Sequence, residues 1–168
     1  MNNQDERFMR IAIGQAALAR QHGDVPFGAV ITRGNDVIAV AYNSEHMDTD
    51  VTLHAETKAI SRACRALGRR DLSDCFLYSS NELCLMCATA AFSACISRIV
   101  YALSRDDLPA LFRPRKIRIA EVALDTQHAP EIVSGVLRDE AMLVYEGMTI
   151  PFRVRPKYTA LDKPVQIV

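Results

Sequence analysis

The chain has 168 residues, of which 49% are hydrophobic and 24% are charged, with 20 basic and 20 acidic side chains. This composition excludes a mainly disordered chain, and the length fits one domain with a full hydrophobic core. The formal net charge of zero provides no overall field that would draw the chain onto nucleic acid or an anionic membrane.

Cysteine usage and the first residues bear on the cell compartment. The segment from Met1 to Glu6 has no apolar core of a secretory leader, so we expect a cytoplasmic protein with reduced thiols. The longest uncharged run, residues 83–97, is too short to span a bilayer, so no membrane partner is expected. Three of the five cysteines lie in apolar segments and are expected to be small buried core residues: Cys64, Cys75 and Cys95.

Apolar periodicity and turn residues predict an alternation of helices and strands. Helices are expected over residues 6–22, 54–67, 84–95 and 137–145, with Thr52 and Asn81 as caps of the second and third. Strands are expected over residues 27–32, 37–42, 75–79, 98–103 and 132–136, and residues 117–122 are expected to be extended. The first two strands form a hairpin around Gly34 and Asn35, and the alternation predicts an α/β domain whose sheet is partly parallel. We expect this domain to occupy residues 1–150 and an extended arm to occupy residues 151–168.

The motif that dominates the chain is His54-Ala55-Glu56 together with Cys84 and Cys87. One imidazole and two thiolates fill three corners of a tetrahedral zinc site and leave the fourth to water, as in a catalytic zinc site. Both parts of the motif open a predicted helix, where free N–H groups favour thiolates. Glu56 is two residues from the histidine and is expected to move protons beside that water. The pattern H-x-E…P-C-x-x-C is typical of the zinc deaminases of nucleobases, and this chain has every element of it except the proline, whose place is taken by Leu83.

Less specific interpretations of the same residues remain open. Cys84 and Cys87 alone also fit a redox pair, and a lone H-x-E is common by chance. A structural zinc site would need a fourth protein ligand from another cysteine. The joint pattern favours a catalytic zinc, because the interval from Glu56 to Cys84 leaves room for one helix, a turn and one strand.

The sequence resembles the cytidine deaminase-like superfamily, in the branch of guanine deaminases and tRNA adenosine deaminases. The matching blocks are Pro26-Phe27-Gly28-Ala29-Val30, Ala41-Tyr42-Asn43, Thr52-Leu53-His54-Ala55-Glu56, Ser80-Asn81-Glu82-Leu83-Cys84-Leu85-Met86-Cys87 and Arg98-Ile99-Val100-Tyr101-Ala102. The resemblance implies a three-layer α/β/α sandwich with a five-stranded mixed sheet, Zn²⁺ on His54, Cys84 and Cys87, Glu56 as proton shuttle, and a homodimer. It also implies substrate contacts by Asn43 and Phe27, although Asn43 also fits a turn residue. Ala55 is a further candidate substrate contact, and so is Asp107, which lies just beyond the strand over residues 98–103 and also fits a helix cap.

Leu83 departs from the family pattern, which usually has proline at that position. We expect a looser or slightly shifted ligand turn and a retained metal. The neutral charge and a C-terminal segment without a dense basic run favour a small amino-heterocycle as substrate, with guanine as the leading candidate. The alternatives are a tRNA adenosine deaminase and a zinc-stabilised binding module without turnover.

Overall fold

The computed structural model describes residues 3–108, 117–126 and 130–148. The helices are α1 (Asn3–Gln21), α2 (Ala55–Leu67), α3 (Leu85–Ser93), α4 (Ile119–Asp125) and α5 (Arg138–Leu143). The strands are β1 (Gly28–Arg33), β2 (Asp36–Tyr42), β3 (Phe76–Asn81), β4 (Arg98–Leu103) and β5 (Glu131–Ser134). Among these described residues no helix is both long and apolar enough to cross a lipid bilayer.

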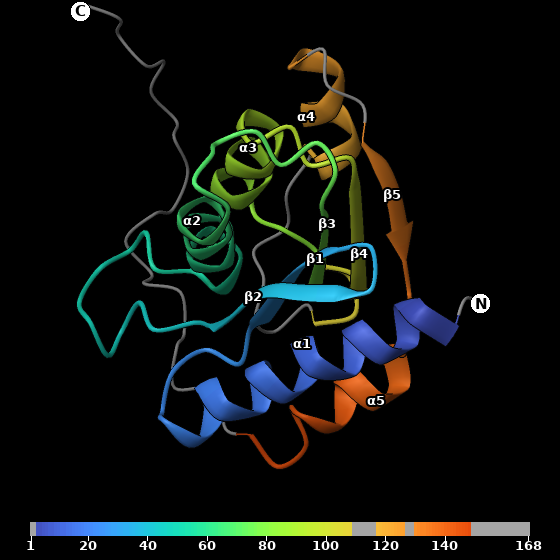
Figure 1. Cartoon of the computed structure of the whole chain (residues 1–168). Coiled ribbons are helices and arrows are strands. Elements are labelled where there is room, and N and C mark those ends of the chain that lie inside the picture. The colour runs from blue at the N-terminus through green and yellow to red at the C-terminus, as the bar shows by residue number, and fades with distance from the viewer. Residues whose placement is uncertain (1–2, 109–116, 127–129, 149–168) are drawn as a thin grey trace, which may run out of the picture.

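The five strands form one mixed sheet in the order β2-β1-β3-β4-β5. β1 pairs antiparallel with β2 and β3, whereas β3 and β4, and β4 and β5, run parallel. Helices α1 and α5 cover one face of the sheet, and α2, α3 and α4 lie on the other (Figure 1). The predicted three-layer α/β/α sandwich with a five-stranded mixed sheet is therefore confirmed.

Alternation along β3 separates two hydrophobic cores. Leu77 belongs to the core under α2, α3 and α4, and Tyr78 belongs to the core under α1 and α5. Because side chains alternate along a strand, Ser79 and Asn81 share the face of Leu77. The end of β3 therefore directs polar side chains towards the layer that contains α2 and α3.

Gly28 allows α1 to lie directly against the start of β1. A Cβ at this position would overlap the Ala12 carbonyl oxygen and the Ala16 amide nitrogen of α1. Ala12 and Ala16 are themselves fully or almost fully buried, so this contact has no bulky side chain that could turn away. Small residues on both elements thus set the spacing of this layer.

The predicted helix caps are wrong. The N-cap residues are His54 for α2 and Cys84 for α3, and neither side chain caps its own helix. The Thr52 hydroxyl instead donates to Asp50 Oδ1 over 2.6 Å, and Asn81 is the last residue of β3. At both helix starts the capping position holds a candidate metal ligand, whose side chain points towards the other ligands rather than to the helix N–H groups.

Two further expectations differ from the structure. The expected extended segment 117–122 contains the first turn of α4, because Ile119 and Ala123 are buried at a helical spacing of four and Glu121 accepts the Arg118 N–H.

Of the three cysteines expected in the core, Cys75 is buried, Cys64 is partly exposed, and Cys95 is exposed. Cys95 follows the end of α3 with φ of +57°, so its side chain leaves the core there. The expected arm over 151–168 lies outside the described residues.

Candidate active site

Three donor atoms from two helix starts converge in the structure. His54 Nδ1 lies 3.5 Å from Cys84 Sγ and 3.4 Å from Cys87 Sγ, and the two sulfurs are 3.4 Å apart. Zinc bonds of about 2.3 Å to sulfur and about 2.0–2.1 Å to nitrogen at tetrahedral angles would separate such donors by roughly 3.5–3.8 Å. The observed triangle therefore fits zinc closely.

The local fold explains why these donors meet. β2 and β3 both run antiparallel to β1, so their C-terminal ends lie at the same end of the sheet. α2 follows β2 and α3 follows β3, which brings the starts of the two helices to that end. Cys84 and Cys87 are one helical turn apart, so both sulfurs point to one side of α3. Leu83 is almost completely buried, and α3 still begins directly after Cys84. Leucine in place of the usual proline therefore leaves the three donors together.

The side chains of His54, Cys84 and Cys87 shift one another's pKa values. Although burial opposes it, hydrogen bonding to Cys84 and Glu45 raises the pKa of His54 to about 10. The hydrogen bond from Cys87, aided by His54 and opposed by burial, lowers the pKa of Cys84 to about 4. The same bond and burial raise the pKa of Cys87. A metal ion at this group needs a neutral imidazole and two thiolates, so its binding would release the protons that these side chains carry.

Glu56 lies beside this triangle and is not part of it. Its side chain is 4% exposed, with Oε2 at 3.5 Å from Cys87 Sγ and Oε1 at 3.3 Å from Ser79 Oγ. Burial, followed by the negative charge of Cys84, raises the pKa of Glu56. A buried carboxylate beside the three donor atoms can take up a proton and then donate it to another group. Within the part of the chain that the structure describes, the metal-binding group contains only His54, Cys84 and Cys87.

Asn43 has one side-chain atom engaged and one free. It is fully buried, and its Nδ2 donates to Asp24 Oδ1 over 2.7 Å. Because a carboxylate only accepts hydrogen bonds, this contact fixes the amide orientation, and Asn43 Oδ1 is a buried acceptor that has no partner among the residues the structure describes. The contact of Asn43 with a substrate stays a prediction.

The other predicted substrate contacts are placed as follows. Phe27 is half-buried against the core beside α2, and its carbonyl accepts the Asn43 N–H. Ala55 is buried as the first residue of α2. Asp107 is engaged by Ser104 N over 2.7 Å and by Arg138 Nη2 over 2.7 Å, so its contact with substrate stays a prediction.

Four residues that the sequence did not single out support the site. Glu45 Oε2 lies 2.8 Å from His54 Nε2, and buried Asp24 holds the loop that carries Asn43 and Glu45.

The other two supporting residues act on the side of β3 and β4. Buried Glu82 accepts the Arg105 N–H and ties the segment after β4 to the turn that carries Cys84. Tyr145 OH lies 2.8 Å from the Pro26 carbonyl and 3.0 Å from Asn81 Oδ1. Burial, together with the charge of Glu56, raises the pKa of Tyr145. These contacts join segments that are distant in sequence, and no local pattern predicts them.

The fold and the three donors, which could hold a metal ion, are those expected of a hydrolase of the deaminase type. The family model described as the cytidine and deoxycytidylate deaminase zinc-binding region matches residues 2–103. The chain belongs to this family and is an aminohydrolase.

Relatives of the chain include deaminases with different substrates. A probable cytosine deaminase of Schizosaccharomyces pombe is 33% identical over 153 residues, which is 88% of this chain and 93% of the relative. The structure of a tRNA:A34 deaminase is 33% identical, with a TM-score of 0.72 over 82% of this chain and 98% of that chain. Guanine deaminase from Nitrosomonas europaea is 26% identical, with a TM-score of 0.73 over 83% of this chain and 81% of that chain.

Proposed function

We propose that the chain is a zinc-dependent hydrolytic deaminase of a free nucleobase or a related amino-heterocycle. The observation that carries the proposal is the position of the buried Glu56 carboxylate, 3.5 Å from Cys87 Sγ and outside the group of three donors. A binding module stabilised by zinc needs the donors and has no use for a buried carboxylate beside them. Hydrolysis requires such a group.

The residues of the chain divide the chemistry between them. Zinc held by His54, Cys84 and Cys87 would supply the positive charge that makes water acidic near neutral pH. Glu56 accepts a proton from that water and passes it to the ring nitrogen of the substrate. Glu56 then takes the second proton, from the hydroxyl group that has been added to the ring carbon, and gives it to the departing amine. The carbon–nitrogen bond breaks, ammonia leaves, and the oxygen of the water stays on the ring. Ser79 holds the carboxylate of Glu56 during these transfers.

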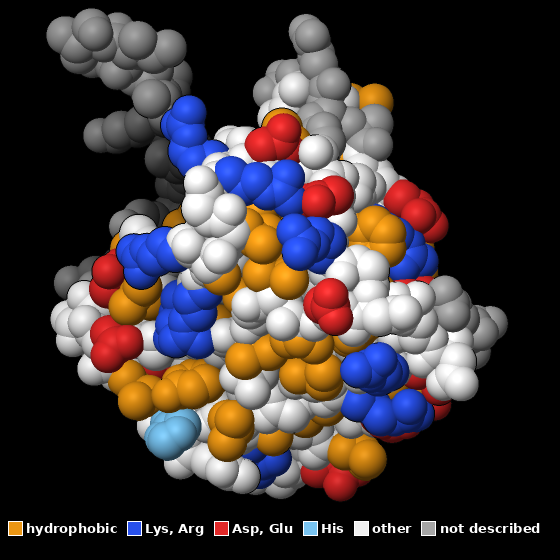
Figure 2. Space-filling view, in the orientation of Figure 1, with side chains coloured by type: hydrophobic (Ala, Val, Ile, Leu, Met, Phe, Trp, Pro, Cys, Tyr) orange, Lys and Arg blue, Asp and Glu red, His pale blue; other side chains and the backbone are white. Residues whose placement is uncertain are grey.

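Charge supports a free base over tRNA as the substrate. The chain is neutral overall, and on the face shown in Figure 2 basic side chains are interspersed with acidic and apolar ones. A tRNA enzyme needs a concentrated basic surface, because neutralised phosphates supply most of its affinity. Guanine remains the leading candidate from the sequence. Cytosine is the second, because the relative that covers 88% of the chain is a probable cytosine deaminase.

We propose that Asn43 recognises the substrate. Its unpartnered Oδ1 would accept an N–H group of the heterocycle, and Asp24 holds the amide so that this atom is not turned away. A buried acceptor that lacks a partner favours a substrate with a matching donor and disfavours an analogue without it. The homodimer, the cytoplasmic location and the domain boundary near residue 150 stay predictions.

Ammonia release tests the proposal. Guanine, cytosine, adenine, their nucleosides and a tRNA panel are assayed with the purified chain, and zinc is measured on the same samples. Glu56→Gln keeps the size of the side chain and cannot take the proton, so turnover should fall by about 10²–10⁴-fold while zinc content is unchanged. A Glu56→Gln variant that turns over the substrate at the parent rate would rule out the mechanism. Loss of zinc in this variant would instead make Glu56 a ligand. Activity on tRNA alone would replace the proposed substrate class.

A further inference from the structure

The loop between β2 and α2 places a carboxylate on the outer nitrogen of the His54 ring. Glu45 Oε2 lies 2.8 Å from His54 Nε2, while His54 Nδ1 faces the sulfurs of Cys84 and Cys87. The two nitrogens of this ring therefore have different partners. One faces the metal-binding group and the other faces a negatively charged acceptor.

Only one form of the neutral ring satisfies both partners. A metal takes the lone pair of Nδ1, so the single ring proton must be on Nε2, and a carboxylate accepts that proton. We propose that Glu45 is a positioning residue that fixes the tautomer and the rotation of His54 for zinc. This inference rests on the proposed function, since it assigns a role toward the metal that the function requires.

The loop that carries Glu45 is held in place independently of any metal. Asp24 is 1% exposed, and its Oδ2 accepts the N–H groups of His46 and Met47 over 3.0 Å each. The Asp50 N–H donates to the Glu45 carbonyl over 3.0 Å. These bonds fix the backbone at Glu45 and directly after it. The carboxylate is therefore positioned before a metal arrives.

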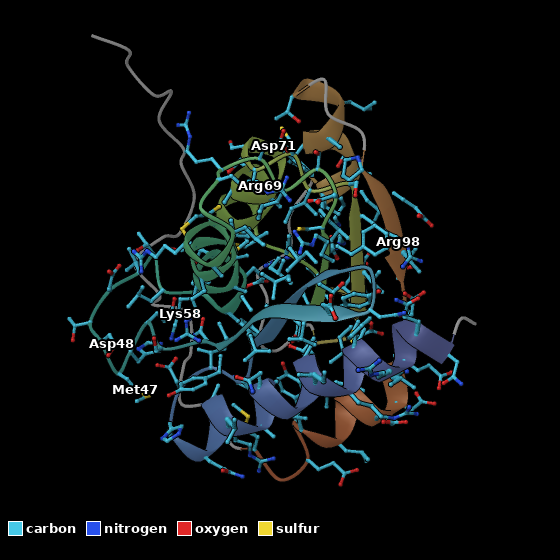
Figure 3. All side chains as sticks on the ribbon, viewed as in Figure 1. Met47, Asp48, Lys58, Arg69, Asp71 and Arg98 are labelled. Atoms are coloured by element: carbon cyan, nitrogen blue, oxygen red, sulfur yellow. The ribbon has the colours of Figure 1, made fainter. Side chains whose placement is uncertain are left out.

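Contacts with α2 hold the same loop at the site. Lys58 Nζ of α2 donates to Ser44 Oγ over 2.6 Å. Lys58 lies on the same side of the molecule as Met47 and Asp48 of the loop, whereas Arg98 projects from the opposite side of the sheet (Figure 3). The Glu45 loop and the helix that follows His54 thus form one unit.

An ordinary surface ion pair is the competing explanation of this contact. The side chains of Glu45 and His54 are 24% and 21% exposed, and Glu45 Oε1 also lies 3.2 Å from His46 Nε2. A surface pair would leave metal affinity unchanged when Glu45 is removed, because its effect is confined to the two side chains. A group that orients a ligand lowers metal affinity when it is lost, typically by about 10–100-fold. Zinc affinity therefore separates the two explanations.

The experiment measures zinc affinity by competition with a chromogenic chelator at neutral pH, with zinc as the only added ligand. Glu45→Ala should weaken zinc binding by about 10–100-fold. Glu45→Gln keeps an acceptor oxygen in the same place and should recover part of that loss. His46→Ala is the matched control, because it removes the other imidazole on Glu45 and leaves His54 untouched, so its zinc affinity should stay within about twofold of the parent.

Ring-nitrogen NMR shifts of His54 in the zinc-loaded parent provide a second measurement, with a proton on Nε2 expected. Zinc affinity of Glu45→Ala within about twofold of a parent that binds one zinc would overturn this inference alone. A proton on Nδ1 in the loaded parent would overturn it as well. A parent that binds no zinc would overturn both this inference and the proposed function, so the two failures are distinguishable.

Discussion

At the scale of single residues, the site depends on side chains whose role is visible only in three dimensions. The donors were predictable, because one histidine and a C-x-x-C pair at helix starts have few other uses in combination. Glu45 and Asp24 were not predictable. Glu45 reaches His54 across an irregular loop without periodicity, and Asp24 contacts residues 19 to 23 positions further along the chain. Such contacts leave no trace in residue spacing.

Asp24 carries a prediction of its own. Its two carboxylate oxygens accept four N–H groups, from Val25, Asn43, His46 and Met47. In Asp24→Asn one of these acceptors becomes an NH₂ group, which faces donors and disturbs the loop. We expect the free energy of unfolding to fall by about 1–3 kcal/mol, because a buried donor is left unsatisfied.

The same variant should lower kcat/KM for the true substrate by more than it lowers zinc content. The reason is that Asp24 contacts Asn43 directly and reaches His54 only through the loop. Urea unfolding, steady-state kinetics and elemental analysis of one preparation measure the three effects. Unchanged stability and kinetics would contradict the role given to Asp24.

At the scale of elements, the strand and helix order followed from hydrophobic periodicity, and the errors were at the termini and in one short segment. Residues 117–122 carry β-branched side chains and were expected to be extended, but the burial of Ile119 and Ala123 at a spacing of four makes this segment the start of α4. The caps were misplaced for a different reason. Thr52 and Asn81 are good capping residues, but α2 and α3 begin later in the chain. Their N-cap positions are occupied by the candidate metal ligands His54 and Cys84.

The packing of α1 on β1 provides a prediction at this scale, with a control in the same helix. Gly28→Ala places a methyl group against the backbone of Ala12 and Ala16, so α1 must move away from the sheet. The expected loss of unfolding free energy is about 1–3 kcal/mol. Gly14 lies in the middle of α1 with open space around it, so Gly14→Ala should gain about 0.5–1 kcal/mol from helix propensity. Opposite signs in urea unfolding would support the argument, and equal signs would refute it.

At the scale of the whole molecule, one network around the buried Asp5 connects α1 to three strands on the side remote from the site. Asp5 Oδ1 accepts Arg98 Nη1 over 2.6 Å and Tyr78 OH over 2.9 Å, and Arg98 Nε donates to Glu131 Oε2 over 2.9 Å. Hydrogen bonding to Arg98, opposed by burial, lowers the pKa of Asp5 below its usual 3.8. Its contribution to stability is therefore present above about pH 3.8 and is lost as the pH falls through the lowered pKa.

Asp5→Asn tests this linkage. At pH 7 the variant should be less stable by up to about 3–5 kcal/mol, since Arg98 loses its buried partner. As the pH falls from about 3.8 through the lowered pKa of Asp5, the difference from the parent should shrink, because the parent carboxylate then takes up its proton as well. Asp36→Asn, at the exposed hairpin, controls for acid effects common to all variants. A stability difference that does not depend on pH would contradict the role of the Asp5 charge.

The 3.4 Å between the sulfurs of Cys84 and Cys87 has a consequence beyond metal binding. The hydrogen bond from Cys87 lowers the pKa of Cys84, which favours its thiolate, the reactive form of cysteine. A chain without zinc thus holds a nucleophilic sulfur next to a second one, which is the arrangement from which an oxidant closes a disulfide. An oxidised pair has no thiolate to offer a metal, so oxidation and zinc loading exclude each other. Free-thiol counts on the purified chain show which state it is in, and the order of adding reductant and zinc decides how much of it is active.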